Sequence, residues 1–179
     1  IAESVRRIRT IALVHETLSR EPGEDIAFIE IVRPLMRLVE EGLQSADRPV
    51  TFEVKGDGGR LPATVATPLS VVILELLQNA VDHGFPEGSA GGSVVVSLSH
   101  DDDALTIRVV NNGVGLSNDF DFSKATGLGL SIVRTLVTTE LAGTIEMCVA
   151  KAEDFAQLSM KTPGSGEGTV VELRVPLQN

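Results

Sequence analysis

The sequence contains no tryptophan and no tyrosine, and six phenylalanines supply all of its large aromatic side chains. Aliphatic residues must therefore fill most of any core. Cys148 is the single cysteine, which excludes an internal disulfide and is typical of a reducing compartment. Its apolar neighbours predict a buried thiol. No apolar run approaches the length of a membrane span and no secretory signal is present, so we expect a cytoplasmic region without membrane contact.

Basic residues are also scarce, because 15 Lys and Arg stand against 25 Asp and Glu and give a net charge of −10. This balance argues against a surface for nucleic acid or anionic membranes. An acidic protein that binds an anion must use local dipoles or a metal ion. The length of 179 residues fits one full domain with an appended element. The chain begins with Ile1, which indicates a piece of a longer protein.

The first 48 residues have helical periodicity. Residues 1 to about 19 carry a wide apolar stripe with arginines opposite, which predicts a helix that needs a partner helix to cover it. A second helix is expected from about Asp25 to Gln44, with a kink or a break at Pro34. His15 lies in the first stripe next to Glu16. It could accept a phosphoryl group or act as a general base, or it could simply pack in a helix pair.

Strands are expected from residue 50 onward. Segments rich in β-branched residues span 50–54, 93–99, 104–110, 143–149 and 168–175, and a short strand is expected at 63–66. The segments 93–99 and 104–110 are joined by three aspartates and predict a hairpin. The last two segments are expected to pair across the insert 150–167, to which we assign no function.

An apolar helix is expected to begin at Pro68, with Thr67 as its N-cap and Gly84 as a left-handed C-terminal cap.

Three polar residues, Glu75, Asn79 and His83, recur on this helix at intervals of four. They therefore line one face. Alone, such a stripe also fits the water-facing side of an ordinary amphipathic helix.

Two glycine segments follow the 104–110 strand. Gly113 and Gly115, in NNGVGL, lie one residue apart at the strand's end, where they let the backbone pass close to a flat ligand. After a loop that carries Lys124, Gly127 and Gly129 open a further helix. A helix N-terminus with exposed N–H groups can seat a phosphate. A tight turn explains this second pair of glycines equally well.

The order of these features is more specific than any one of them. ELLQNAVDHGF resembles the N box, NNGVGL the G1 box and TGLGLSIVRTLV the G2 box of the ATP-binding domain of sensor histidine kinases. That domain belongs to a superfamily that includes gyrase, Hsp90 and MutL. The resemblance covers residues 50–177. It implies an α+β, two-layer sandwich, with a mixed sheet and about three helices on one face.

The N-terminal segment RRIRTIALVHETLS resembles the second dimerisation helix of HisKA_2-type kinases, which are related to the HWE group and include the actinobacterial PdtaS-type kinases. The resemblance divides the chain into part of a dimerisation and histidine-phosphotransfer domain (1–20), a connecting helical segment (21–48) and an ATP-binding catalytic domain (49–179). In this group the phosphoacceptor lies on the first dimerisation helix in a His-Arg-x-x-Asn setting. The sequence has no such setting, so His15 is interpreted as a packing residue and the chain should not phosphorylate itself.

The resemblance also implies ATP and Mg²⁺ as cofactors. Asn79 would ligate Mg²⁺ through its amide oxygen, and Glu75 would be the catalytic carboxylate that positions the accepting imidazole. The other expected ATP contacts, from the glycine segments and their neighbours, are His83, Asn111, Gly113, Gly115, Leu116, Lys124, Gly127, Leu128, Gly129 and Thr169.

The function implied is transfer of the ATP γ-phosphoryl group to a histidine on an upstream helix, and then to an aspartate of a response regulator. The PdtaS-type likeness favours an RNA-binding ANTAR regulator, and the full-length kinase would be a homodimer. One alternative is an anti-sigma-factor-type serine kinase, a class that generally lacks the N-terminal helices. A degenerate nucleotide-binding or docking module is the second. A hydrolysing ATPase of the gyrase type would need a transducer domain.

Asn111 departs from the family pattern, which has aspartate there to accept a hydrogen bond from the adenine amino group. An amide oxygen can still accept, but it carries no charge. A lost charge-assisted bond costs about 1–3 kcal/mol, or roughly ten- to a hundredfold in affinity. We therefore predict weakened nucleotide binding that tightens, by calorimetry, in Asn111→Asp.

Overall fold

A computed structural model gives the fold. It describes residues 5, 8–9, 11–12, 15–16, 19, 23–43, 49–117, 119–124, 127–163 and 167–177. The elements in chain order are β1 (Ile26–Ala27), α2 (Ile29–Leu43), β2 (Val50–Lys55), β3 (Arg60–Leu61), α3 (Ala63–Gly84), β4 (Gly92–His100), β5 (Ala104–Asn111), the 3-10 turn η1 (Phe122–Lys124), α4 (Leu128–Thr135), its π-helical continuation η2 (Leu136–Glu140), β6 (Thr144–Val149), α5 (Ala152–Gln157) and β7 (Thr169–Pro176).

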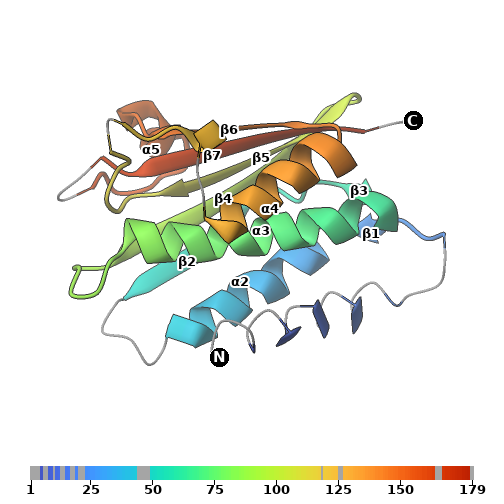
Figure 1. The fold of residues 1–179 in the computed structure, drawn as a ribbon, viewed down its shortest axis with the longest axis horizontal. Coiled ribbons are helices and arrows are strands. Elements are labelled where there is room, and N and C mark those ends of the chain that lie inside the picture. Colours follow the sequence, from blue (N-terminus) through green and yellow to red (C-terminus); the bar gives the residue numbers. More distant parts are fainter. Residues whose placement is uncertain are drawn as a thin grey trace.

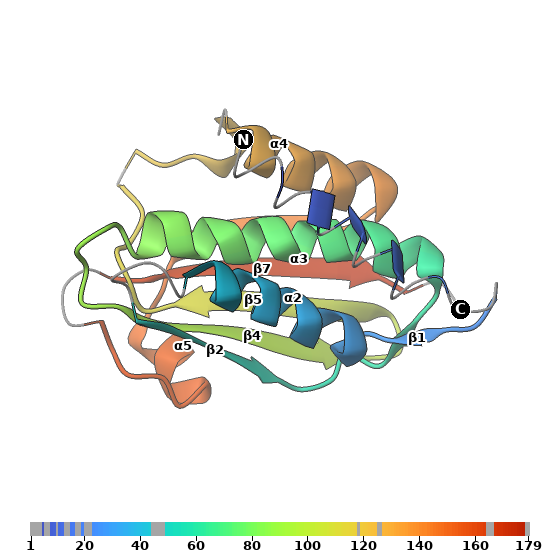
Figure 2. The same cartoon turned by 90° about the horizontal axis from the view of Figure 1, so that it is seen from below.

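The five longer strands form one mixed sheet in the order β2-β4-β5-β7-β6. The pair β2–β4 is parallel, and the other three pairs are antiparallel. The predicted hairpin is therefore confirmed as β4–β5, and the predicted pairing of the last two strands as β6–β7. Three helices, α2, α3 and α4, cover one face of the sheet, with α3 between the other two (Figures 1 and 2). The expected α+β two-layer architecture is confirmed.

Helix α3 is the centre of the main core. Its side chains Leu69, Ile73 and Leu77 are fully buried against the sheet and the two flanking helices. Among the described residues, α3 alone is long and apolar enough to cross a membrane by length and composition, although no apolar run of that length was expected from the sequence. More than half of that stretch is buried inside the fold, as expected of a core helix.

The beginning of α3 differs from the expected one. Residues 63–66 are helical rather than a strand, so Thr67 is not the N-cap and Pro68 lies inside the helix. Proline in a helix removes one backbone hydrogen bond. Extending the helix back to Ala63 buries Ala66 completely, and the apolar contact that this adds offsets the missing bond.

Helix α2 begins at Ile29 instead of Asp25, because β1 pairs with β3 and holds residues 26–27 in an extended conformation. Pro34 lies inside α2, and the helix continues through it without a break. On the inner face of the helix, Met36, Val39 and Leu43 are buried, whereas Ile29 is only partly buried.

The opposite face of the sheet has a small core of its own. Helix α5, from the insert 150–167, lies on this face (Figure 1). The cluster consists of side chains from α5, its flanks and three strands: Val95, Val110, Ala150, Phe155, Leu158 and Val170. Arg108 binds Asp154, and Lys55 donates to the Leu158 carbonyl. The insert therefore stabilises the sheet from behind.

Cys148 is exposed, so the expectation of a buried thiol is wrong. It lies on the edge strand β6, where exposed and half-buried residues alternate. Ile145 and Met147 point to the helical core, and Cys148 points to the other face. A period of two reverses the face of neighbouring residues, which the apolar composition of the segment did not reveal.

Candidate nucleotide-binding site

The C-terminal half of α3 and the ends of three strands enclose a small cavity. Its walls come from α3, β5, the segment after β5, β6 and β7: Leu76, Asn79, Ala80, His83, Gly84, Val109, Asn111, Val114, Gly115, Leu116, Met147, Thr169 and Val171. Six of the residues expected to bind the nucleotide or its metal ion are among them: Asn79, His83, Asn111, Gly115, Leu116 and Thr169. The structure therefore brings residues that are far apart in the sequence, such as Asn79 and Thr169, to one cavity.

The polar stripe of α3 divides between the cavity and the neighbouring helix. Asn79 is half-buried and His83 is exposed, and both line the cavity. Glu75, one turn earlier, does not line it. A Cβ atom added to Gly129 would lie 2.5 Å from Glu75 Oε2, so this carboxylate lies against the first turn of α4. Gly129 therefore leaves room for Glu75, and the expected catalytic and glycine residues meet there.

Gly84 and Gly113 hold the end of α3 against the end of β5. The Val114 amide donates to the Gly84 carbonyl at 2.8 Å. A Cβ on Gly113 would lie 2.0 Å from that same carbonyl oxygen, so no larger residue fits. Gly84 does not have the expected left-handed conformation; a Cβ there would lie 2.9 Å from Asn111 Oδ1. Close approach, rather than backbone conformation, is what requires glycine at position 84.

Asn111 and Thr169 form a buried polar pair. They lie opposite each other in the β5–β7 ladder and are 3% and 7% exposed. Asn111 Nδ2 donates to Thr169 Oγ1 at 2.6 Å, and the Gly113 amide donates to Asn111 Oδ1 at 3.1 Å. Buried polar groups of this kind fix a single side-chain arrangement.

Asn112 has a structural role instead. Its Oδ1 accepts from the Ser93 amide at 2.8 Å, and its Nδ2 donates to the Lys161 carbonyl at 3.0 Å. These bonds join the beginning of β4 and the insert to the end of β5. Asn112 is not among the residues that line the cavity.

The loop between the two glycine segments contributes fewer residues to the cavity wall than expected. Lys124 has a side chain that is 83% exposed and pairs with Asp121 at 3.5 Å, outside the cavity lining. Gly127 is exposed with open space around its Cα. The Leu128 side chain lies outside the described residues. Their assignment as ATP contacts stays a prediction.

The apolar walls were missed from the sequence. Val109 pairs with Val171 across β5 and β7, and Val171 with Met147 across β7 and β6. Together with Leu76 and Ala80 of α3 they form the apolar part of the wall beside the polar pair. Strand alternation could have predicted two of these residues. Val109 lies two residues before Asn111, and Val171 lies two residues after Thr169, so each shares a face of the sheet with its polar neighbour.

The cavity is narrow, at about 40 Å³. Ligand pockets usually occupy roughly 300–1,000 Å³. A nucleotide base therefore enters only if the walls separate. Val114 and Leu116 lie on the segment that follows β5, and Val114 is 47% exposed.

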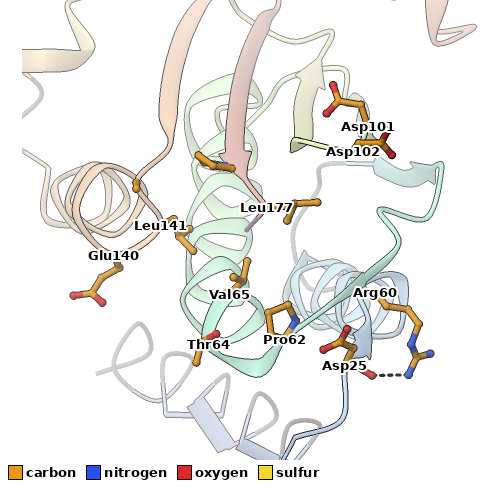
Figure 3. A pocket seen from close by; sticks show the side chains of 12 residues that line it. Asp25, Arg60, Pro62, Thr64, Val65, Asp101, Asp102, Glu140, Leu141 and Leu177 are labelled. Carbon is orange, nitrogen blue, oxygen red and sulfur yellow. Dashed lines mark hydrogen bonds between the residues drawn. The ribbon is translucent and has the colours of Figure 1, made fainter. Parts of the chain in front are cut away.

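A larger cavity, of about 950 Å³, lies at the other end of α3 (Figure 3). Four carboxylates line it, from Asp25, Asp101, Asp102 and Glu140, beside a single cation, Arg60. The Arg60 guanidinium already donates to the Asp25 carbonyl. Like charges repel, and no free cation among the lining residues offsets them. The larger cavity is therefore unsuited to a polyphosphate, and the small cavity is the better candidate.

His15 is exposed, and the Ser19 hydroxyl lies 3.2 Å from its Nδ1 atom. Most of the predicted first helix lies outside the described residues. Within the described part, Val5, Ile8 and Ile11 are also exposed. The apolar stripe has no cover from the described residues of this chain, and the packing role of His15 stays a prediction.

Comparison with known proteins agrees with this geometry. The family described as histidine kinase-, DNA gyrase B- and HSP90-like ATPases matches residues 64–179. The chain is 37% identical over 177 residues to the sensor histidine kinase PdtaS of Mycobacterium tuberculosis, and equally so to PdtaS of Mycolicibacterium smegmatis. These matches cover 99% of this chain and 32% of each relative, so the chain spans about a third of their length.

Solved structures show the same fold. The histidine kinase domain of the Erythrobacter litoralis blue-light-activated kinase EL346 has a TM-score of 0.71 at 23% identity, over 97% of this chain and 74% of that one. The histidine kinase ThkA, solved in complex with the response regulator protein TrrA, has a TM-score of 0.62 at 21% identity, over 99% of this chain and 49% of that one. With a family match over well more than half of its length, the chain belongs to the histidine kinase-, DNA gyrase B- and HSP90-like ATPases.

Proposed function

We propose that this chain is the ATP-binding catalytic region of a two-component sensor histidine kinase. The observation that carries the proposal is the small cavity, where Asn79 of α3 meets the Asn111–Thr169 pair of the sheet. One side of this cavity has an amide of the kind that ligates a hard cation, and the other has paired polar groups beside an apolar surface. A nucleotide needs both chemistries at once, and the likeness to PdtaS supports a kinase.

Asn79 would hold Mg²⁺ through its amide oxygen. Magnesium is usually bound by one or two protein oxygens together with phosphate oxygens and water. Asn79 fits this mode, because its half-buried side chain lines the cavity and offers one amide oxygen. The ion would neutralise phosphate charge, which a chain of net charge −10 otherwise repels.

The residues of this chain would bind and orient the reactants. The apolar surface and the Asn111–Thr169 pair would hold the base, while Asn79 and His83 would face the phosphates. In the transfer step, an imidazole nitrogen forms a bond to the γ-phosphorus as the bond from that phosphorus to the bridging oxygen breaks. The proton on the other ring nitrogen is released. Glu75, against the first turn of α4, would orient the imidazole by accepting a hydrogen bond from it.

The acceptor histidine, the response regulator, the homodimer and a cytoplasmic location belong to the proposed whole protein. The uncovered apolar residues Val5, Ile8 and Ile11 support a helix that pairs with a second subunit. The PdtaS likeness favours an ANTAR-type regulator.

Autophosphorylation of the full-length protein with γ-labelled ATP tests the proposal. We expect acid-labile label in the full-length protein and none in residues 1–179 alone. Glu75→Gln should lower the rate by about 10²–10⁴-fold, the usual contribution of such a group, with little change in ATP affinity. His15→Ala should keep the label. Label on His15, or a Glu75→Gln protein that works at full rate, would contradict the assigned roles.

The degenerate binding module remains a second candidate, and Asn111 is the observation that favours it. Calorimetry of ATP with and without Mg²⁺ separates the two proposals, because a module that has lost nucleotide binding gives no heat in either condition.

A further inference from the structure

The amide of Asn111 has only one orientation that fits its surroundings. The Gly113 amide, a donor, lies 3.1 Å from one end of the side-chain amide, and that end must be the oxygen. The nitrogen then faces Thr169 at 2.6 Å. The opposite orientation would place the NH₂ group against the Gly113 N–H. The backbone therefore fixes the direction of the Asn111–Thr169 hydrogen bond.

This direction determines what Thr169 can offer to a ligand. Thr169 Oγ1 accepts from Asn111 Nδ2, so the hydroxyl hydrogen is not used in the pair. With a carboxylate at position 111, which can only accept, the hydroxyl would have to donate to it. Asparagine reverses the pair, and Thr169 becomes a donor on the wall of the cavity.

The reversed pair presents both kinds of group. Asn111 keeps a second Nδ2 hydrogen and a second lone pair on Oδ1, and Thr169 has its hydroxyl. Adenine offers a donor at its 6-amino group and an acceptor at N1. A 6-keto purine offers an acceptor at O6 and a donor at N1. A carboxylate that faces position 6 can accept from the 6-amino group but would repel O6, whereas the Asn111–Thr169 pair can match either group at that position.

Among the described residues, no other side chain on the cavity wall imposes a choice. Its remaining polar side chains are Asn79 and His83, which lie on the α3 stripe assigned to the phosphates, and the rest of the wall is apolar or glycine. We propose that Asn111 relaxes the selection at position 6 of the purine, so that this chain binds inosine nucleotides about as well as adenosine nucleotides. This inference rests on the proposed function.

The test compares ATP with inosine triphosphate, because the two differ only at position 6 and the adjacent N1. Affinities are measured by calorimetry with Mg²⁺ for the wild type and for Asn111→Asp. We expect the wild type to bind ATP less than about tenfold more tightly than inosine triphosphate. In Asn111→Asp this ratio of affinities should be at least about tenfold larger, because the carboxylate is mismatched with O6. Asn112→Asp is the matched control, since it places the same change one residue away with its side chain outside the cavity. It should leave the wild-type ratio unchanged.

A wild-type preference for ATP above about tenfold overturns the inference and leaves the proposed function intact. The same holds if Asn111→Asp binds both nucleotides with the wild-type ratio. Should the Asn111→Asp protein fail to fold, the wild-type ratio alone decides. If the wild type binds neither nucleotide, that result contradicts the proposed function itself.

Discussion

The two ends of α3 face opposite kinds of surroundings. At Gly84 the helix meets amide and hydroxyl side chains, glycines and an apolar wall around about 40 Å³. At Ala63 it borders a cavity of about 950 Å³ lined by four carboxylates (Figure 3). The comparison teaches that the size of a cavity does not identify a nucleotide site in an acidic protein. The charge and hydrogen-bonding capacity of the wall decide it.

The two ends of α3 also differ in the contacts around them. The Gly84 end is fixed by backbone contacts, from the Gly84 carbonyl to Val114 and across Gly113. Beside the Ala63 end, Asp101 of the large cavity pairs with Arg174 at 3.6 Å, and both side chains are more than half exposed. Backbone contacts of this closeness leave no room for substitution, whereas exposed ion pairs contribute little.

The largest effect is expected for Gly113→Ala. The new Cβ would lie 2.0 Å from the Gly84 carbonyl oxygen, so α3 and β5 must separate. Overpacking of this kind costs about 1–3 kcal/mol, and nucleotide binding should be lost with it. Gly127→Ala is the matched control, because nothing lies within 4 Å of its added Cβ. Urea unfolding measures both, and equal stability of the two variants would contradict the close packing of the Gly84 end.

A smaller effect on the stability of the fold is expected when the pH is lowered. Burial alone would raise the pKa of Asp154, but the Lys151 amide and Arg108 outweigh it and the pKa is lowered below 3.8. A lowered pKa stabilises the fold above the ordinary value, and this stabilisation disappears as the pH falls through the folded value. Asp154→Asn should therefore be less stable at about pH 7 and lose less stability below about pH 4.

Asp101, on the wall of the large cavity, gives the matched comparison for that experiment. Hydrogen bonds from the Asp103 and Ala104 amides lower its pKa as well. Because Asp101 is exposed, solvent screens these interactions, and Asp101→Asn should change the acid midpoint less than Asp154→Asn does. Unfolding midpoints between about pH 3 and 7 measure both, and the reverse order would show that the insert does not stabilise the sheet.

The smallest effect is expected from Asp102→Asn and Glu140→Gln in the large cavity. Both remove a negative charge far from the small cavity. ATP affinity should stay within about twofold, because salt screens charges beyond roughly 10 Å. A large gain in affinity for either variant would place the phosphates in the wrong cavity.

Much of the fold follows from local patterns. Alternation predicted the strands, and the order of the three boxes predicted the sandwich. The errors lie where tertiary contacts outweigh local signals. Thr67 and Pro68 look like the beginning of a helix, but burial of Ala66 extends α3 backward. Residues 26–27 have helical periodicity, but pairing with β3 makes them a strand.

The sequence likewise indicated the polar residues of the cavity wall but not the apolar ones. Asn79, Asn111 and Thr169 were selected because their residue types carry chemistry, and the structure places all three on one cavity. The apolar wall was not found, because Val109 and Met147 look like any other core residues. Nor does the sequence indicate the direction of the Asn111–Thr169 hydrogen bond, which depends on the position of the Gly113 amide.

The central claim is that Asn79 connects a magnesium ion to a nucleotide held against the Asn111–Thr169 pair. Calorimetry of ATP binding with Mg²⁺ and with a chelator, in the wild type and in Asn79→Ala, tests it most directly. The wild type should bind at least about tenfold more tightly with Mg²⁺, equivalent to about 1.4 kcal/mol, and Asn79→Ala should lose that difference. An Asn79→Ala protein that keeps the full magnesium dependence would contradict the claim.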